Sequence, residues 1–259
     1  MDFKHIIFTL KDNVGTIKLN RTDVLNSFNK EMAEETQEAL KECEKNENVR
    51  AIIITGEGRA FCAGQDLAEA MKAGSDLATI VKKQYNPIIK LIRNIEKPVI
   101  AAVNGVAAGA GANIAFACDF VIAAKSTLFI QSFSKIGLIP DSGGTFFLPR
   151  IAGFARATAM MMLGDKLTSE KALEYGLVYK VADDENVISE ANSLAQHLAK
   201  MATRGLGLTK KALNNSYYNS LNEQLSLEEK LQDEAGHTKD YSEGVKAFLE
   251  KRKPQFTGK

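Results

Sequence analysis

The sequence predicts an α/β fold in which a mostly parallel β-sheet is followed by a helical C-terminal region. Residues 50–55 (RAIIIT) and 98–103 (PVIAAV) have the apolar, β-branched pattern of strands buried on both faces, and a helical stretch separates them. Beyond about Gly144 the β pattern fades and helical patterns dominate. Strands that alternate with helices indicate parallel pairing, with functional loops at the carboxyl ends of the strands.

The overall composition excludes several classes of protein. Of 259 residues, 45% are hydrophobic and 25% are charged, which is typical of a soluble globular chain. The formal net charge of +1 argues against a nucleic-acid partner. The longest apolar stretch, residues 98–124, is interrupted by Asn104, Asn113 and Asp119, and the N-terminus lacks the pattern of a signal peptide, so no membrane partner and a cytoplasmic location are expected.

Histidine and cysteine are too sparse and too scattered for a metal site. The three histidines, His5, His197 and His237, stand alone, without the spacing that zinc ligands show. The three cysteines are odd in number and lack CxxC spacing, which indicates reduced thiols. Cys62 lies in the loop FCAGQDL (61–67), and we favour core packing over a nucleophilic role for it. No metal is therefore predicted.

The first half of the chain supplies most of the predicted strands. Strands are expected at 6–10, 15–19, 50–55, 98–103, 120–123 and 128–130, with a turn at Asp12-Asn13 between the first two. Helices are expected at 30–45, at 75–95 and from about 112 to 117. Ser75 is a candidate N-cap of the long helix, and Pro87 is expected to kink it.

The second half of the chain is predicted to be largely helical. One strand is expected at 177–181, and helices at 156–163, 169–175, 187–201, 209–220, 222–235 and 242–251. Helices added to an α/β core favour a lid or an oligomerisation element.

Three loops rich in small residues follow predicted strands. Their sequences are FCAGQDL (61–67), NGVAAGAGAN (104–113) and GLIPDSGGT (137–145). The middle loop has Ile114 where a dinucleotide fingerprint requires glycine, and a close-packed turn explains it at least as well. Alternatively, small residues that open a helix leave backbone N–H groups free, and FCAGQDL could supply a second donor. Two such donors make an oxyanion hole.

Asp141 has two interpretations. Between Pro140 and Ser142 it could cap a helix. As a lone carboxylate near apolar Phe133 and Ile139, it could instead have a raised pKa suited to proton transfer. Asp119 is expected to cap or pair structurally. Asp66 could brace its loop or touch a ligand.

At these loops the sequence resembles the crotonase superfamily, the enoyl-CoA hydratase/isomerase family. The matching blocks are 20–28 (NRTDVLNSF), 61–67 (FCAGQDL), 99–119 (VIAAVNGVAAGAGANIAFACD), 169–178 (SEKALEYGLV) and 243–256 (EGVKAFLEKRKPQF). The resemblance implies a spiral of ββα units, with a crotonase-type acyl-CoA-binding core at 1–200 and a helical trimerisation or lid region at 201–259. It also implies a homotrimer or homohexamer.

The resemblance implies an acyl-CoA thioester substrate and a thioester enolate stabilised by two backbone N–H groups. Carried over by position, these donors belong to Gln65 and Ala110. Coenzyme A would be part of the substrate, and no separate cofactor is expected. The residues expected to bind substrate are Ala63, Gly64, Asp66, Leu67, Gly111, Phe133 and Ile139.

Two departures from the family pattern bear on the reaction. Family hydratases use two glutamates, and the matching positions here hold Asn113 and Phe133, neither of which exchanges protons. Asp141 stands where some isomerases of the family carry their catalytic acid. The sequence thus predicts an acyl-CoA isomerase, most similar to those acting on ring 1,2-epoxyphenylacetyl-CoA, which form an oxepin-CoA and also shift enoyl-CoA double bonds. The alternatives are an enoyl-CoA hydratase and a non-catalytic acyl-CoA-binding homologue.

Overall fold

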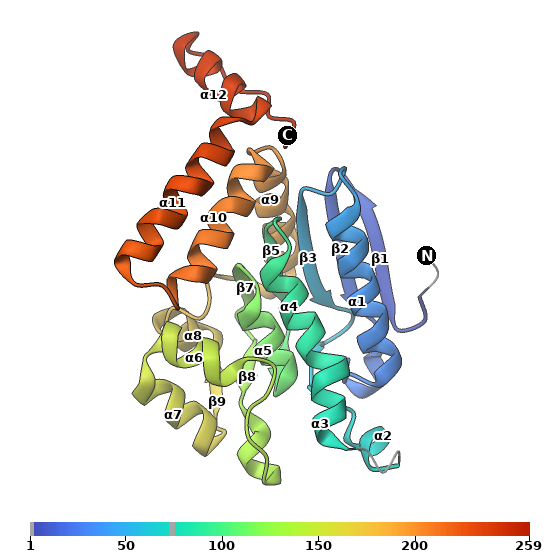
Figure 1. Cartoon of the computed structure of the whole chain (residues 1–259). Helices are drawn as coiled ribbons and strands as arrows, with labels where there is room; N and C mark the ends of the chain where they lie inside the picture. The colour runs from blue at the N-terminus through green and yellow to red at the C-terminus, as the bar shows by residue number, and fades with distance from the viewer. Residues whose placement is uncertain (1–2, 73–75) are drawn as a thin grey trace.

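Two β-sheets and the helices around them form the body of the protein in the computed structural model, which describes residues 3–72 and 76–259 (Figure 1). The larger sheet has the strand order β1-β2-β3-β5-β7-β10 and the smaller has the order β4-β6-β8-β9. In the larger sheet β1 and β2 pair antiparallel, and β2, β3, β5, β7 and β10 are parallel. In the smaller sheet β4, β6 and β8 are parallel, and β9 is antiparallel to β8.

The chain alternates between the two sheets as it advances. The strands of the larger sheet are β1 Ile6–Lys11, β2 Val14–Leu19, β3 Ala51–Gly56, β5 Val99–Val103, β7 Phe120–Ala124 and β10 Lys180–Ala182. Those of the smaller sheet are β4 Ala60–Cys62, β6 Val106–Ala108, β8 Leu128–Ile130 and β9 Lys166–Thr168. Thus β3–β4, β5–β6 and β7–β8 each place one strand in each sheet before the chain turns into helix. This is the predicted spiral of ββα units.

The central strands are buried on both faces, as their sequences indicate. In β3, Ile52 and Ile54 belong to the core shared with the helices α1 Lys30–Lys45 and α4 Asn86–Asn94. Ile53 points to the opposite face and packs in a second core with α9 Val187–Ala199. Alternate residues of a strand point to opposite faces, so an unbroken apolar run requires two cores.

The loops expected at 61–67 and 104–113 are wrong in part, because β4 includes the first two residues of the former and β6 lies within the latter. β4 and β6 are too short to produce a periodic signal, and they are identified only by their pairing of Ala60 with Val106 and Cys62 with Ala107. β9 was also not predicted. The single strand expected at 177–181 is β10, which begins three residues later.

The single helix expected at 75–95 is divided in the structure. It consists of α3 Leu77–Ile80, a π-helical turn at Val81–Tyr85 and α4, in whose first turn Pro87 lies. Asp76 caps α3 by accepting a hydrogen bond from the N–H of Ala78 (3.0 Å). The predicted cap, Ser75, lies outside the described residues. A short helix α2, Leu67–Lys72, precedes this region.

The second half of the chain is helical, as predicted, with shifted boundaries. Its helices are α6 Gly144–Ala152, α7 Phe154–Leu163, α8 Ser169–Glu174, α9, α10 Thr203–Ser216, α11 Leu221–Gly236 and α12 Lys239–Leu249. α6 was not predicted, because it contains Pro149. α10 starts six residues earlier than expected despite Gly205 and Gly207, and Gly207 lets it pass close to the backbone of Glu96.

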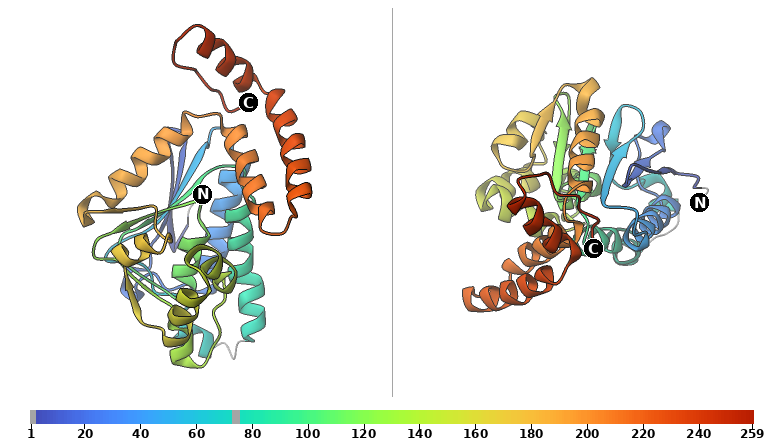
Figure 2. Two further views of the ribbon diagram at one scale, coloured as in Figure 1. Left: turned by 90° about the vertical axis from the view of Figure 1, so that its left-hand side faces the viewer. Right: turned by 90° about the horizontal axis from the view of Figure 1, so that it is seen from above.

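α11 and α12 stand away from the body of the protein (Figures 1 and 2). The C-terminal tail folds back, where Arg50 Nη1 donates to the carbonyl of Phe256 (2.9 Å) and Lys259 pairs with Glu47 (2.8 Å). In the described ranges, no helix is both long and apolar enough to span a bilayer.

Candidate active site

The predicted oxyanion-hole residues follow two neighbouring parallel strands. Gln65 comes three residues after β4, and Ala110 opens α5, Ala110–Ala117, two residues after β6. The loops are so close that a Cβ added to Gly64 would lie 3.0 Å from the carbonyl oxygen of Ala108 and 3.8 Å from the nitrogen of Ala110. The structure therefore brings the two predicted donors together.

Both backbone N–H groups are free to bind a ligand. Within the described ranges, neither the N–H of Gln65 nor that of Ala110 donates a hydrogen bond to the protein. The first N–H groups of a helix have no partner inside the helix, and they carry its partial positive charge. Two such donors can stabilise the negative charge that develops on a thioester oxygen.

Two glycines allow the close approach of α5. Gly109 adopts φ +52° and ψ −126°, a conformation that strains residues with a side chain, and turns the chain from β6 into the helix. A Cβ on Gly111 would lie 2.5 Å from the carbonyl oxygen of Cys62. Gly111, predicted to bind substrate, thus seats α5 against β4.

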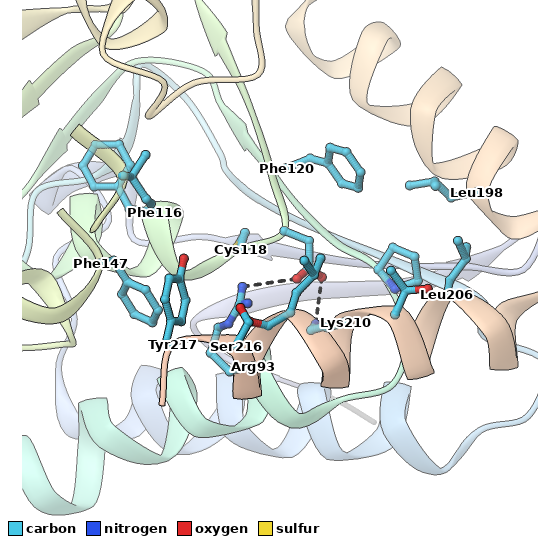
Figure 3. Close-up of a pocket in the computed structure, with 15 residues that line it drawn as sticks. Arg93, Phe116, Cys118, Phe120, Phe147, Leu198, Leu206, Lys210, Ser216 and Tyr217 are labelled. Atoms are coloured by element: carbon cyan, nitrogen blue, oxygen red, sulfur yellow. Dashed lines mark hydrogen bonds and ion pairs between the residues drawn. The ribbon is translucent and has the colours of Figure 1, made fainter. Parts of the chain in front are cut away.

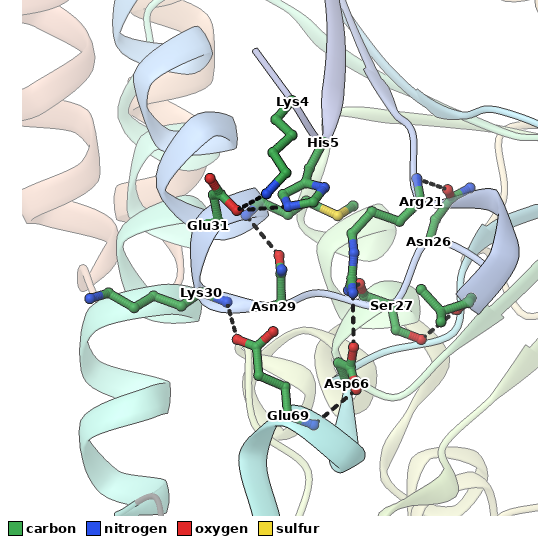
Figure 4. Close-up of polar contacts among 12 residues, drawn as sticks. Lys4, His5, Arg21, Asn26, Ser27, Asn29, Lys30, Glu31, Asp66 and Glu69 are labelled. Atoms are coloured by element: carbon green, nitrogen blue, oxygen red, sulfur yellow. Dashed lines mark hydrogen bonds and ion pairs between the residues drawn. The ribbon is translucent and has the colours of Figure 1, made fainter. Parts of the chain in front are cut away.

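The Gln65 loop is held by the segment that precedes α1 (Figure 4). Phe28 brackets Gln65, because its N–H donates to the carbonyl of Gly64 (2.7 Å) and its carbonyl accepts from the N–H of Asp66 (2.9 Å). The N–H of Ala63 donates to the carbonyl of Leu25 (3.0 Å). Three backbone groups of residues 63–66 are therefore fixed while the Gln65 N–H stays free.

Asp66 braces the same loop by its side chain. Its carboxylate pairs with Arg21 (3.0 Å) and caps α2 through the N–H of Glu69 (3.1 Å) (Figure 4). Burial opposes ionisation of Asp66, but the Glu69 N–H and the Arg21 guanidinium outweigh it and lower its pKa. Arg21 also donates to the carbonyl of Ser27 (2.6 Å). Sequence reasoning missed Arg21, whose only signal was its place in the NRTDVLNSF block.

Asp141 is a partly buried carboxylate close to the start of α6. Burial raises the pKa of Asp141, and a hydrogen bond from Ser142 Oγ (2.8 Å) opposes this shift. The helix-cap interpretation is wrong, because Gly143 is the N-cap of α6 and no side chain caps that helix. The expectation of a raised pKa is confirmed in direction.

Asn113 connects Asp141 to the helix that carries Ala110. Asn113 is fully buried one turn along α5, where its Nδ2 donates to the carbonyl of Asp141 (2.8 Å) and its Oδ1 accepts from Gln131 Nε2 (2.8 Å). Gly144 packs directly on this amide. Asn113 therefore has a positioning role, and both ends of its amide are occupied.

The remaining predicted substrate-binding residues differ in their surroundings. The Phe133 ring is buried beside Gly109, at 3.7 Å from the position that a Cβ on this glycine would take. Ile139 is 80% exposed and Leu67 is 46% exposed. Phe133 is thus already close to the candidate oxyanion hole, whereas Ile139 projects into solvent in the single chain.

A cavity of about 480 Å³ lies at the other end of α5 and is separate from this site (Figure 3). Its wall includes Phe116, Cys118 and the Asp119 carboxylate, which accepts hydrogen bonds from Lys210 (2.7 Å) and Arg93 (3.2 Å). None of Gln65, Ala110 and Asp141 lines it. The structural role predicted for Asp119 is confirmed.

Burial also determines the state of the cysteines. The thiols of Cys43, Cys62 and Cys118 are free and buried, and burial raises the pKa of each to about 12. Cys62 therefore packs as a neutral thiol under α5, as expected. Across residues 3–72 and 76–259, no cluster of histidine, cysteine, aspartate and glutamate could hold a metal ion.

Comparisons with known proteins agree on one family. Residues 9–259 match the profile of the enoyl-CoA hydratase/isomerase family. The chain is 49% identical to the 1,2-epoxyphenylacetyl-CoA isomerase of Escherichia coli (strain K12), covering 98% of each chain. It is 39% identical to the trans-2-decenoyl-[acyl-carrier-protein] isomerase of Streptococcus mutans serotype c, covering all of both. The crystal structure of an enoyl-CoA hydratase from Bacillus anthracis superposes with a TM-score of 0.92 at 34% identity, covering 99% of this chain and all of the other.

Proposed function

Because the chain belongs to the enoyl-CoA hydratase/isomerase family, the crotonase superfamily, we propose that it is an acyl-CoA isomerase. The proposed reactions are conversion of 1,2-epoxyphenylacetyl-CoA to an oxepin-CoA, a double-bond shift in enoyl-CoA, or both. The observation that carries the proposal is the single carboxylate, Asp141, whose pKa is raised by burial and whose backbone is tied to the helix of the oxyanion hole.

One carboxylate is enough for an isomerisation. The thioester oxygen accepts hydrogen bonds from the N–H groups of Gln65 and Ala110, which stabilise the enolate. Ionised Asp141 removes a proton from the carbon next to the thioester carbonyl and returns it to a different carbon of the acyl group, so the product is an isomer of the substrate. Coenzyme A is part of the substrate, and the reaction needs no further cofactor.

The surroundings of Asn113 and Phe133 argue for isomerisation over hydration. Asn113 cannot take up a proton, and its amide is already bonded to Asp141 and Gln131. Phe133 has no polar group. Two relatives with isomerase names, one acting on an epoxide thioester and one on an enoyl thioester, support the same choice.

Asp141→Asn tests the mechanism. The substitution keeps the size of the side chain and removes its proton-transfer capacity, so we expect a loss of turnover of 100-fold or more with 1,2-epoxyphenylacetyl-CoA and with 3-enoyl-CoA. Acyl-CoA affinity, measured by calorimetry, should change little. Asp233→Asn, at a carboxylate that is 78% exposed, is the matched control. Full activity of Asp141→Asn would refute the mechanism.

A hydratase is the second candidate, favoured by the structural match to the Bacillus anthracis enzyme. Hydration of crotonyl-CoA at a rate typical of family hydratases would establish it and contradict the argument from Asn113 and Phe133. Acyl-CoA binding without turnover of enoyl or epoxide thioesters would instead indicate a non-catalytic homologue.

We further propose a homotrimer or homohexamer, in which residues 201–259 serve as the trimerisation or lid region. Leu221, Phe248 and Leu249 are each more than 70% exposed on α11 and α12, which stand away from the body. Large apolar side chains exposed on protruding helices favour burial against another subunit. Multi-angle light scattering tests this, and a monomer in solution would contradict it.

A further inference from the structure

Tyr85 has a buried hydroxyl group that nothing in the protein satisfies. Its side chain is 0% exposed, and Oη has no hydrogen-bond partner among the described residues. Leaving a buried hydroxyl unpaired costs about 1–3 kcal/mol, which phenylalanine would avoid with nearly the same shape. Such a group calls for a specific explanation.

Among the described residues, a second buried side-chain atom without a partner is linked to Asp141. It is Oε1 of Gln131, whose Nε2 donates to Asn113, the residue that holds the carbonyl of Asp141. Both unpaired side-chain atoms found in the described ranges thus lie near the candidate active site.

A π-helical turn of the backbone positions Tyr85. Tyr85 ends the π-helical turn Val81–Tyr85, whose extra residue changes the direction of the side chains that follow. Because Pro87 has no N–H, one carbonyl of this turn loses its helical donor. The Gln37 side chain replaces it by donating to the carbonyls of Lys83 (2.9 Å) and Gln84 (3.1 Å). The turn is therefore supported from outside, as π-turns at functional sites often are.

Tyr85 packs against the segment that holds the Gln65 loop. Its ring packs edge-on against Phe28, with centroids 6.0 Å apart, and Phe28 brackets Gln65 through its backbone. Burial is the main cause that raises the pKa of Tyr85 above its ordinary value, and the negative charges of Asp141 and Asp66 raise it further. The hydroxyl therefore stays protonated and is available as a donor.

We infer that Tyr85 determines substrate specificity by donating a hydrogen bond from Oη to an oxygen atom of the acyl group. The inference rests on the proposed function, in which Gln65 and Ala110 already bind the thioester oxygen. Asp141 faces the carbons that exchange a proton, so a third donor near it meets the acyl group beyond the thioester. The ring oxygen of an epoxide thioester supplies the missing acceptor.

A hydrocarbon acyl group would leave the hydroxyl unsatisfied. An enoyl chain has no oxygen beyond the thioester, so it would bury Tyr85 Oη against carbon. The acyl group must displace neighbouring side chains to reach this buried hydroxyl. An acyl group with an oxygen atom then accepts a hydrogen bond from Tyr85 Oη, and a hydrocarbon group does not. Tyr85 thus favours oxygenated over hydrocarbon acyl groups.

Tyr85→Phe tests the inference through a ratio of two activities. We expect kcat/KM for 1,2-epoxyphenylacetyl-CoA, divided by kcat/KM for a 3-enoyl-CoA, to fall about 10- to 100-fold. Tyr218→Phe, at a hydroxyl on a 73% exposed side chain, is the control and should leave the ratio unchanged. The melting temperature of Tyr85→Phe should equal or exceed that of the wild type, because the substitution removes an unpaired buried hydroxyl.

A binding measurement separates failure of this inference from failure of the proposed function. The probes are 2-hydroxyphenylacetyl-CoA, which carries a ring oxygen, and phenylacetyl-CoA, which does not. Tyr85→Phe should weaken binding of the first about tenfold or more and of the second much less, whether or not the wild type turns over either substrate class. Equal effects on both probes, or an unchanged activity ratio in an active enzyme, would overturn the role of Tyr85. A wild type that isomerises neither class would refute the proposed function alone.

Discussion

Gly111→Ala should separate the two donors of the proposed oxyanion hole, the N–H groups of Gln65 and Ala110. The added Cβ would lie 2.5 Å from the carbonyl oxygen of Cys62 and 2.7 Å from its Cβ and Sγ. That oxygen belongs to β4, which pairs with β6, so the strand cannot yield easily. Restoring an ordinary contact distance requires α5 to move by about 1 Å, and Ala110, its first residue, moves with it.

The expected loss of activity follows from this displacement. Misplacing a reacting or stabilising group by about 1 Å can cost ~100-fold in rate, and loss of one oxyanion-hole donor costs ~100- to 1,000-fold. We therefore expect kcat to fall about 100-fold. Overpacking costs about 1–3 kcal/mol of unfolding free energy, and the higher helix propensity of alanine returns about 1 kcal/mol. The protein should remain folded.

The assay is steady-state isomerisation of a 3-enoyl-CoA, accompanied by chemical denaturation. Gly205→Ala is the matched control, because it is the same substitution inside helix α10 and its Cβ would meet only the Cβ of Ala202 at 3.8 Å. It should stabilise the protein by up to about 1 kcal/mol and preserve activity. A Gly111→Ala variant with wild-type kcat would refute the assignment of Ala110 as an oxyanion donor.

Two further predictions concern charged groups around the site. Arg21→Met should lower kcat about tenfold and the unfolding free energy by about 1–3 kcal/mol, because Asp66 loses its partner and the Gln65 loop loses a brace. The control is Lys18→Met, which removes a more exposed ion pair with Glu57. Equal effects of the two substitutions would contradict a specific role of Arg21. Because burial raises the folded-state pKa of Asp141, its contribution to stability is present at acid pH and is lost as pH rises through that pKa. In denaturation series from pH 4 to 8, the unfolding free energy of Asp141→Asn should therefore rise relative to that of the wild type as pH rises. Wild-type kcat/KM should rise through the same ionisation. An unfolding free energy of Asp141→Asn that falls relative to the wild type with rising pH would contradict a raised pKa of Asp141.

Elements with a long regular pattern are those that the sequence predicts well. The helix expected at 30–45 coincides with α1, and the strand expected at 15–19 lies within β2. β4, β6 and β9 have three residues each, and they exist because a second sheet offers partners far along the chain. No local pattern contains that information.

The residues of the candidate site likewise differ in whether the sequence alone identifies them. Gln65, Ala110 and Asp141 lie in loops whose composition is unusual, so the loops and the family resemblance together identify them. The roles of Arg21 and Tyr85 depend on tertiary contacts: an ion pair across 45 positions and a buried hydroxyl in a π-turn. In the sequence, Tyr85 is only one apolar position on a helix.

The buried polar groups at two places in this protein differ in whether the protein itself satisfies their hydrogen bonds. Asp119 and Lys210 bury charge beside the cavity of about 480 Å³, but Asp119 accepts hydrogen bonds from Lys210, Arg93 and the Val99 N–H, so its carboxylate is satisfied within the protein. At the carboxyl ends of β4 and β6, two backbone N–H groups, the Tyr85 hydroxyl and a carboxylate of raised pKa are left incompletely satisfied. A folded chain retains such unfavourable groups together where a ligand completes them. For this reason we propose that the acyl group binds beside Gln65, Ala110 and Asp141 and not in the cavity beside Asp119.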